Sequence, residues 1–223
     1  MCTKDKMFSE EYMYNKIYNI AIQENYPNTY KALSYAREKH SGTYRKPSIY
    51  QKEPDMVEYI THPLTMACHA YALGIRDDIT FATILLHDVC EDCGVNVNEI
   101  PFDSEVQEAV ALLTKHPDKG QTTKEYYEGI RKNKTASFVK VLDRCNNVST
   151  MAQSFTKEKL EEYIGETEKY VYPLMDYVQE NYSEYEEMVY NIKYQMISII
   201  DTIKVFVFKQ QIWEGFDEIG TLS

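Results

Sequence analysis

The scarcity of helix breakers is the feature of this sequence that most limits its fold. Eight glycines and seven prolines are spread over 223 residues, whereas an all-β chain needs these residues in many tight turns. The long segments between them carry apolar side chains at helical spacing, for example at Val106, Ala109, Val110 and Leu113. The sequence therefore predicts an all-α protein.

Helix ends are marked by N-caps and breakers. Ser9, followed by acidic residues, is a suitable N-cap for the first helix, and Ser104 for a later one. Pro63 suits the first residue of a helix, and a surface loop is expected over 43–58, which contains two prolines. The expected helices span 8–24, which Pro27 ends, then 29–40, 64–73, 78–91, a segment from 104, 123–132, 135–152, and two long amphipathic helices between 157 and 213, one of which Pro173 interrupts or starts.

Composition and charge exclude several classes of protein. The formal net charge of −11 argues against a nucleic-acid polymer as ligand, because phosphate backbones require clustered Lys and Arg. No apolar run is long enough to span a bilayer, and no signal peptide is visible. Five cysteines, an odd number, suit a reducing compartment. We therefore expect a cytoplasmic protein without a membrane partner.

Four ionisable side chains follow the apolar run 81–86 and form the strongest chemical signal in the sequence: His87, Asp88, Glu91 and Asp92. In a continuous helix Glu91 would lie four residues after His87, and Asp92 four after Asp88, so all four would reach toward one side. A buried carboxylate beside an imidazole is costly unless a cation such as a metal ion compensates its charge. The segment therefore predicts a metal site with two further carboxylates available for proton transfer.

Two distant residues complete a set of metal ligands. His62 lies at a loop-to-helix junction, and Asp143 follows an apolar run. Alone, His62 would be interpreted as a cap-like histidine, and Asp143 as the partner of Arg144. Together with His87 and Asp88 they provide two imidazoles, two carboxylates and no thiolate. This set suits manganese or iron and is also compatible with zinc or cobalt.

Two other patterns carry less weight. Cys90 and Cys93 form a C-x-x-C pair, but no second pair has zinc-ribbon spacing, so both are interpreted as structural thiols. Lys115 and Lys119, near Gly120, are too sparse to predict a phosphate-binding loop.

The order of the candidate ligands resembles the HD superfamily of metal-dependent phosphohydrolases, in which a His is followed by a His-Asp pair and a distant Asp. Within it, the chain is similar to alarmone hydrolases of the RelA/SpoT type. Matching segments occur in the family's order: KHSGTYRK (39–46), YITHP (59–63), LLHDVCED (85–92), VKVLDRCNNVST (139–150) and ETEKYVYPL (166–174).

The resemblance implies an HD-domain helical bundle over 28–180. It also implies that an N-terminal helix within 1–27 packs on this bundle and that 181–223 forms a helical C-terminal extension. No part of 183–223 resembles the synthetase domain of long family members, so a stand-alone hydrolase is expected.

The resemblance also implies a role for each matching residue. The metal ligands would be His62, His87, Asp88 and Asp143, with manganese as the usual ion. The pair that positions the attacking water and takes its proton would be Glu91 and Asp92. The residues beside the guanine and the phosphates would be Arg45 and Lys46, and further polar contacts to the nucleotide would come from Asn147 and Thr150. His40 would support the adjoining loop, and Arg144 would form an ion pair with Asp143 or another acidic residue.

The reaction implied is hydrolysis of the 3′-pyrophosphate of guanosine tetra- or pentaphosphate, which releases GDP or GTP and pyrophosphate. The loop between Lys46 and Tyr59 is longer than is usual in the family, and it flanks the expected base pocket. Two alternatives therefore stay open: another ribose-phosphorylated nucleotide as substrate, such as NADPH or an adenine alarmone, or a non-catalytic helical module that binds a nucleotide or a protein. The expected partner is a small nucleotide, and a homo-oligomer is compatible with the sequence.

Overall fold

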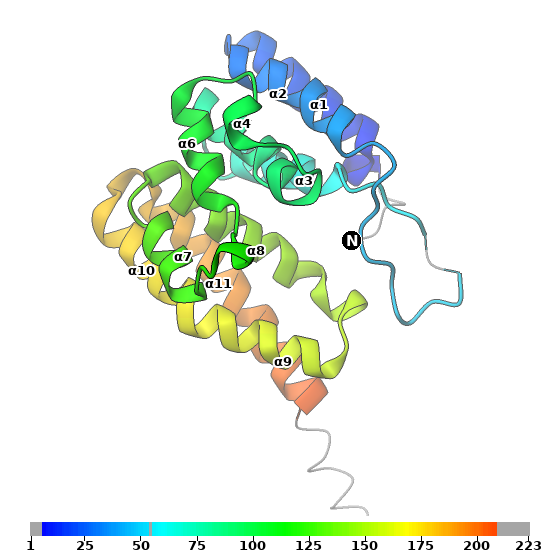
Figure 1. Cartoon of the computed structure of the whole chain (residues 1–223). Helices are drawn as coiled ribbons and strands as arrows, with labels where there is room; N and C mark the ends of the chain where they lie inside the picture. The colour runs from blue at the N-terminus through cyan, green and yellow to red at the C-terminus, as the bar shows by residue number, and fades with distance from the viewer. Residues whose placement is uncertain (1–5, 54, 209–223) are drawn as a thin grey trace, which may run out of the picture.

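The structure, a computed structural model, describes residues 6–53 and 55–208 and is built from helices (Figure 1). Within these residues the only β-type pairing is an isolated antiparallel bridge between Tyr44 and Glu58. The expectation of an all-α protein is confirmed. The α-helices are α1 (Glu10–Gln23), α2 (Pro27–Lys39), α3 (Thr61–Ala72), α4 (Asp78–Leu86), α5 (Val89–Asp92), α6 (Ser104–Leu113), α7 (Thr123–Ile130), α8 (Lys134–Ser154), α9 (Lys157–Glu166), α10 (Tyr172–Asn181) and α11 (Glu186–Ile203).

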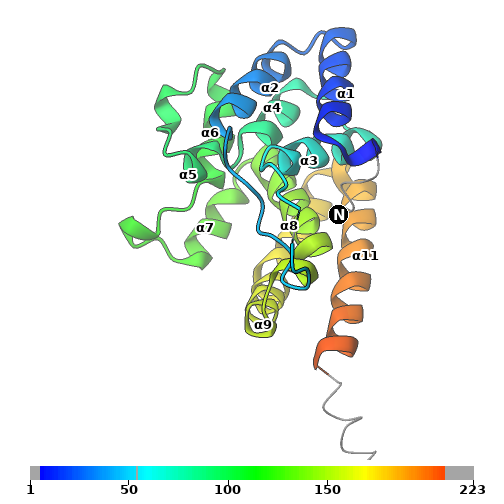
Figure 2. The same ribbon diagram turned by 90° about the vertical axis from the view of Figure 1, so that its right-hand side faces the viewer.

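Helix α8 lies between two groups of helices (Figures 1 and 2). It contacts α3, α4 and α6 of one group, and α7, α10 and α11 of the other. Its buried residues include Asp143, Arg144 and Asn146 in addition to apolar side chains. Buried polar groups need hydrogen-bond or charge partners. We therefore expect the partners of these three side chains on the helices that pack around α8.

The start of α2 differs from the sequence expectation. Pro27 was expected to end the first helix, but α1 already ends at Gln23, and Pro27 begins α2 instead. The Asp78 carboxylate, at the start of α4, accepts hydrogen bonds from the backbone amides of Asn28 (3.0 Å) and Thr29 (2.8 Å). Amides that a helix leaves unsatisfied at its first turn are thus capped by a residue distant in sequence, which no local pattern could indicate.

Caps and boundaries elsewhere were partly as expected. Ser9 is confirmed as the N-cap of α1, since its hydroxyl accepts from the Tyr12 amide at 3.3 Å. Ser104 is instead the first residue of α6, and Asp103 occupies the N-cap position. Helix α3 begins at Thr61, so His62 lies inside its first turn rather than in the loop before it. This placement gives His62 a rigid backbone.

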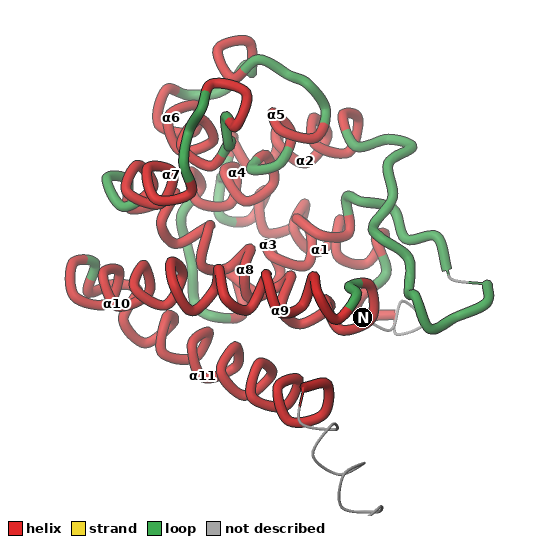
Figure 3. Tube along the Cα trace, turned by 60° about the horizontal axis from the view of Figure 1, so that its bottom comes forward, coloured by secondary structure: helices red, strands yellow, loops and turns green. Residues whose placement is uncertain are grey.

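The loop expected over 43–58 is present and extends along the edge of the molecule (Figure 3). Its base is closed by backbone hydrogen bonds from Arg45 to Val57 (2.8 Å) and from Tyr59 to Thr43 (2.9 Å). Its first half is joined to the end of α8, because the Ile49 amide donates to the Gln153 carbonyl at 2.9 Å. The first half of the loop is therefore held against the C-terminal half of α8, the same helix that the Arg45 side chain contacts.

The last third contains more helical segments than the two expected. A π-helical turn, Thr167–Val171, separates α9 from α10, and Pro173 lies in the first turn of α10. A proline there lacks the amide that would continue a regular helix, which accounts for the change in winding. Helix α11 is followed by a second π-helical turn, Lys204–Phe208. The end of the expected helix, 209–213, lies outside the described residues. Among the described helices, none is both long and apolar enough to cross a membrane.

The buried guanidinium of Arg144, on α8, makes several polar contacts. It forms an ion pair with Glu166 and donates to the Tyr127 hydroxyl (3.0 Å) and the Thr167 hydroxyl (3.2 Å). The sequence left its acidic partner undefined, and the structure identifies Glu166. Arg144 thereby joins α8 to the junction of α9 and the π-helical turn.

Substitution of Glu166 by glutamine is expected to lower the free energy of unfolding by about 3 kcal/mol, because it leaves a buried guanidinium without its counter-charge. Chemical denaturation would measure the loss. Glu184→Gln is the matched control, since its ion pair with Lys134 is exposed on both sides and should contribute less than about 1 kcal/mol. Equal losses in the two variants would contradict a structural role for the Arg144–Glu166 pair.

Candidate metal centre

Three helical segments bring together two histidines and an aspartate. His62 comes from the first turn of α3, His87 directly follows α4, and Asp143 lies in the middle of α8. One potential ligand atom from each lies within 4.8 Å of the others, and all three residues are buried. Asp143 Oδ1 is 3.2 Å from His62 Nε2 and 3.8 Å from His87 Nε2. Residues 25 and 81 positions apart from His62 in sequence thus share one small volume.

The orientation of both imidazoles leaves their Nε2 atoms facing this volume. Nδ1 of His62 lies 2.7 Å from the Asn146 side-chain oxygen, and Nδ1 of His87 lies 2.7 Å from the Ile84 carbonyl oxygen. Because an oxygen can only accept here, each Nδ1 carries the proton and donates it. Within the described part of the chain, neither buried Nε2 makes a hydrogen bond of good geometry, and the nearest polar neighbours are carboxylate oxygens, Asp143 Oδ1 at 3.2 Å from His62 Nε2 and Asp88 Oδ2 at 2.9 Å from His87 Nε2. Fixing Nδ1–H by an oxygen while Nε2 faces carboxylates is the usual arrangement of metal-binding histidines.

Asp88 adjoins this cluster from the other side. Its Oδ2 is 2.9 Å from His87 Nε2 and 3.7 Å from His62 Nε2, and it accepts a hydrogen bond of 2.6 Å from the Tyr59 hydroxyl. Its carboxylate is partly exposed, whereas that of Asp143 is buried. All four residues proposed from the sequence as metal ligands are therefore neighbours.

The charges of the cluster call for a cation. Burial opposes ionisation of Asp143, but Lys140, whose Nζ is 2.9 Å from Oδ2, and the two imidazoles hold the pKa of this carboxyl well below its usual range. Burial also opposes a charge on His87, yet Asp88 and Asp143 outweigh it and raise the pKa of His87 to about 10. The carboxylates thus attract positive charge to His87 Nε2, whereas burial lowers the pKa of His62 and keeps its imidazole neutral. A divalent metal ion between the two Nε2 atoms would supply the positive charge. Two imidazoles with carboxylates suit such an ion.

The helix expected over 78–91 is interrupted at the cluster. Helix α4 ends at Leu86, His87 and Asp88 form a turn, and α5 is a separate helix of four residues. The four ionisable side chains therefore do not share one side of a helix, and that expectation is wrong. The interruption lets His87 and Asp88, neighbours in sequence, approach the same volume from different directions.

Glu91 and Asp92 lie in different surroundings. Asp92 is close to Tyr59 and Asp88, and partial burial together with the charge of Asp88 raises the pKa of its carboxyl. Glu91 instead accepts a hydrogen bond from the backbone amide of Lys115 at 3.2 Å. Successive residues of a helix point about 100° apart, which separates the two carboxylates. Asp92 is thus the carboxylate on the side of Tyr59.

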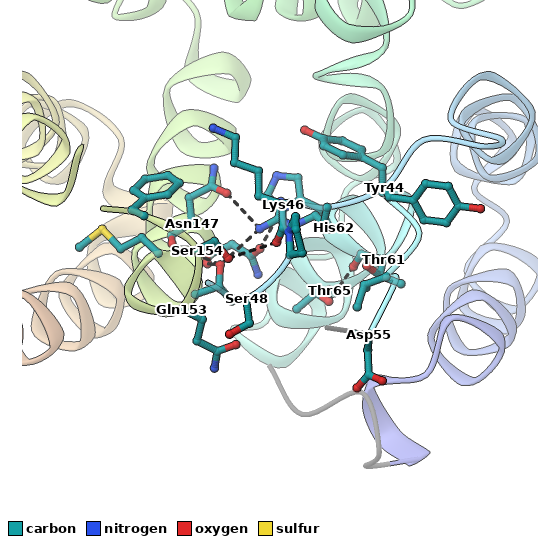
Figure 4. A pocket seen from close by; sticks show the side chains of 18 of the residues that line it. Tyr44, Lys46, Ser48, Asp55, Thr61, His62, Thr65, Asn147, Gln153 and Ser154 are labelled. Atoms are coloured by element: carbon teal, nitrogen blue, oxygen red, sulfur yellow. Dashed lines mark hydrogen bonds between the residues drawn. The ribbon is translucent and has the colours of Figure 1, made fainter. Parts of the chain in front are cut away.

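A cavity of about 430 Å³ opens beside His62 and is lined by all four residues expected to bind substrate (Figure 4). Arg45 donates to the side-chain oxygens of Asn147 and Thr150, both at 3.3 Å. The Lys46 ammonium lies 5.3 Å from the centroid of the Phe155 ring. The volume lies in the range of small-molecule sites, and the cationic and amide groups suit a phosphorylated ligand.

Three residues at the centre were not singled out by the sequence. Lys140 and Asn146 lie three residues on either side of Asp143, a spacing that places side chains on one helix face, so helical periodicity could have indicated them. Tyr59 has no comparable signal, since its hydroxyl reaches Asp88 across 29 positions of sequence. Contacts at that separation depend on the packing of α3 against α4.

His40 lies next to the centre without belonging to the ligand cluster. It is buried, its ring centroid is 4.8 Å from that of Tyr59, and its Nδ1 is 3.5 Å from Cys93 Sγ. Burial lowers the pKa of His40 to about 4. The imidazole is therefore neutral at pH 7.

The pKa of His40 predicts a loss of stability in acid. Between pH 6.5 and about 4 the unfolded chain binds a proton at this histidine that the folded protein does not, so the free energy of unfolding should fall as the pH drops through this window. Urea denaturation at several pH values would measure the slope. In His40→Gln, which cannot titrate, the slope should be shallower, and an unchanged slope would contradict the prediction.

Within the described residues, the structure is an all-α fold with a buried His-His-Asp group compatible with a metal ion. No protein-family model matches the sequence. Among solved structures, the chain is similar to a metazoan orthologue of SpoT that is described as hydrolysing ppGpp and playing a role in starvation responses. The TM-score is 0.61 and the sequence identity 20%, over 79% of this chain and 95% of the other. This likeness confirms the fold that the resemblance implied.

Proposed function

We propose that this protein is a metal-dependent phosphohydrolase that removes the 3′-pyrophosphate of guanosine tetra- or pentaphosphate, producing GDP or GTP and pyrophosphate. The observation that carries the proposal is the pair of buried Nε2 atoms of His62 and His87, which face the carboxylates of Asp88 and Asp143 beside a cavity of about 430 Å³. The likeness in fold to a protein that hydrolyses ppGpp supports this choice of substrate. Residues 28–180 would form the hydrolase unit, with the described parts of the two flanking segments, 6–27 and 181–208, packed on it.

The metal would be held by His62, His87, Asp88 and Asp143, and we propose manganese. When bound, a divalent ion lowers the pKa of a coordinated water toward about 7 and offsets the charge of a phosphoryl group. Lys140 keeps the Asp143 carboxylate ionised and in place through its 2.9 Å contact. The Tyr59 hydroxyl holds the Asp88 carboxylate in place by donating to its Oδ2 at 2.6 Å.

The remaining residues would position the substrate and transfer protons. Asp92, whose raised pKa makes its carboxylate a stronger base, would accept the proton of the attacking water. The new bond joins the water oxygen to the phosphorus attached to O3′, the P–O3′ bond breaks, and O3′ takes up a proton as pyrophosphate leaves. Arg45 and Lys46 would bind the phosphates and the base, while Asn147 and Thr150 hold the Arg45 guanidinium in place.

Product analysis would test the proposal directly. Purified protein supplied with manganese is incubated with ppGpp, pppGpp, their adenine counterparts and NADPH, and products are separated by anion-exchange chromatography. We expect pyrophosphate and GDP or GTP from the guanosine substrates. Faster turnover of an adenine counterpart would change the substrate but not the reaction, whereas NADPH, which carries a single 2′-phosphate, would release phosphate in place of pyrophosphate. No release of phosphate or pyrophosphate from any of them would favour the non-catalytic module.

A further inference from the structure

A second hollow, of about 400 Å³, lies beside α5 and is distinct in its lining from the cavity next to His62. Its wall includes Glu91, Thr114, Lys115, His116 and Lys119. Two lysines face one carboxylate here, on a chain whose formal net charge is −11. Helices α5 and α7, which flank this region in sequence, lie to the left of α8 in Figure 2. A local excess of positive charge on an acidic protein indicates an anionic ligand.

The Lys115 ammonium is only weakly neutralised. In the described part of the chain its one ion pair is with Glu166, at 3.7 Å. The same Glu166 oxygen is already paired with Arg144 and accepts a hydrogen bond from the Tyr127 hydroxyl at 3.1 Å. Partial burial is the main reason that the pKa of Lys115 is lowered. The Lys115 ammonium is therefore partly desolvated and shares its counter-charge with Arg144.

This lysine is also connected to the metal centre. Its backbone amide holds Glu91 at 3.2 Å. Its Nζ lies 5.1 Å from the centroid of the Tyr126 ring, and the Nζ of Lys140, which contacts Asp143, lies 5.7 Å from the same centroid. Two ammonium groups thus adjoin one aromatic ring next to a candidate metal ligand.

The two hollows have no lining residue in common. Asn147 and Thr150, which contact Arg45, follow Asp143 by about one and two helical turns, so the nucleotide cavity extends roughly 10 Å along the C-terminal half of α8. Lys140 precedes Asp143 by one turn. A ligand with its nucleoside in the first cavity and a phosphoryl group at the cluster would point its outer phosphate toward Lys140 and Lys115.

We propose that Lys115, assisted by Lys119, forms a diphosphate-binding site beyond the metal centre, which holds the outer phosphate of the substrate and the inorganic diphosphate product. The inference rests on the proposed function in taking a diphosphate as the group removed. Lysine ammonium groups bind phosphate oxygens through charge-assisted hydrogen bonds. Glu91 does not cancel the site, because one carboxylate faces two ammonium groups and one of its oxygens is engaged by the Lys115 amide.

Calorimetric titration with inorganic pyrophosphate tests the site without turnover. The protein is used as purified, in buffer without added metal. Lys115→Met should weaken pyrophosphate binding at least about tenfold, the effect expected for loss of one charge-assisted hydrogen bond. Lys115→Arg should largely restore it, and Lys119→Met, in an exposed turn, should weaken it less. The matched control is Lys124→Met on α7, an exposed lysine paired with Glu128 at 3.7 Å, which should bind as the wild type does.

Several results would overturn the site: no pyrophosphate binding by the wild type at millimolar concentration, equal affinity in Lys115→Met, or a loss caused by Arg45→Met in the first cavity instead. Thermal melting of each variant shows whether it folds. If Lys115→Met does not fold, the Lys119→Met variant still tests the site. The proposed function can be rejected independently of this site. Lys115-dependent binding of pyrophosphate without turnover of any nucleotide would reject the reaction and keep the site, whereas turnover with Lys115-independent product inhibition would reject the site alone.

Discussion

Replacement of Asp143 by alanine is expected to remove the metal ion and the activity together. Its Oδ1 lies within 3.8 Å of both imidazole Nε2 atoms, so the substitution takes away the one buried carboxylate of the cluster. Outer-shell partners of metal ligands already contribute about 10–100-fold to affinity or activity, and loss of a ligand should exceed this. Metal content after gel filtration, together with pyrophosphate release, would measure both effects.

The same substitution should also destabilise the protein, which requires a control. Lys140, only 14% exposed, would lose the carboxylate that it contacts at 2.9 Å, and breaking such a pair costs about 3–5 kcal/mol. The double variant Asp143→Asn with Lys140→Met removes both charges and should recover much of this stability while still failing to bind metal. Asp176→Asn, an exposed carboxylate paired with Lys193, controls for loss of an acid elsewhere. Full metal content in Asp143→Ala would reject the assignment.

Substitution of Asp92 by asparagine should leave the metal bound and lower turnover by about 10²–10⁴-fold, the contribution typical of a general acid or base. The amide is nearly isosteric but cannot accept the proton of water. Retention of metal in Asp92→Asn would separate proton transfer from metal binding. The measurements are steady-state pyrophosphate release and metal content.

Glu91→Gln forms the second half of this prediction. The resemblance implies that Glu91 works with Asp92, so we expect turnover to fall and metal to stay bound. The hydrogen bond from the Lys115 amide to Glu91 survives the change, because an amide oxygen still accepts. Glu99→Gln, which changes an exposed acid close to Glu91 in sequence, should leave turnover unchanged. Full activity in both Asp92→Asn and Glu91→Gln would reject the proton-transfer role of the pair.

Much of the fold followed from local patterns. The cap at Ser9 and the helical start around Pro63 depend on interactions within one turn, so the sequence could predict them. The break at His87 and Asp88 could not be predicted, because each residue is compatible with a helix and the turn is stabilised by contacts to α3 and α8. The same holds for the start of α2, where Asp78 supplies the cap from 49 and 50 positions away.

The candidate site divides in the same way. The sequence by itself determined the chemical types available, two imidazoles and two carboxylates without a thiolate, and the helical class, because both depend on composition and short-range periodicity. Only the tertiary structure decided that Asp92 lies beside Tyr59 while Glu91 turns to Lys115, and that a basic hollow lies beyond the cluster. Those arrangements arise where α5 meets the segment after α6 and where Tyr59, just before α3, meets Asp88. The direction of a side chain across such a contact depends on residues far away in sequence.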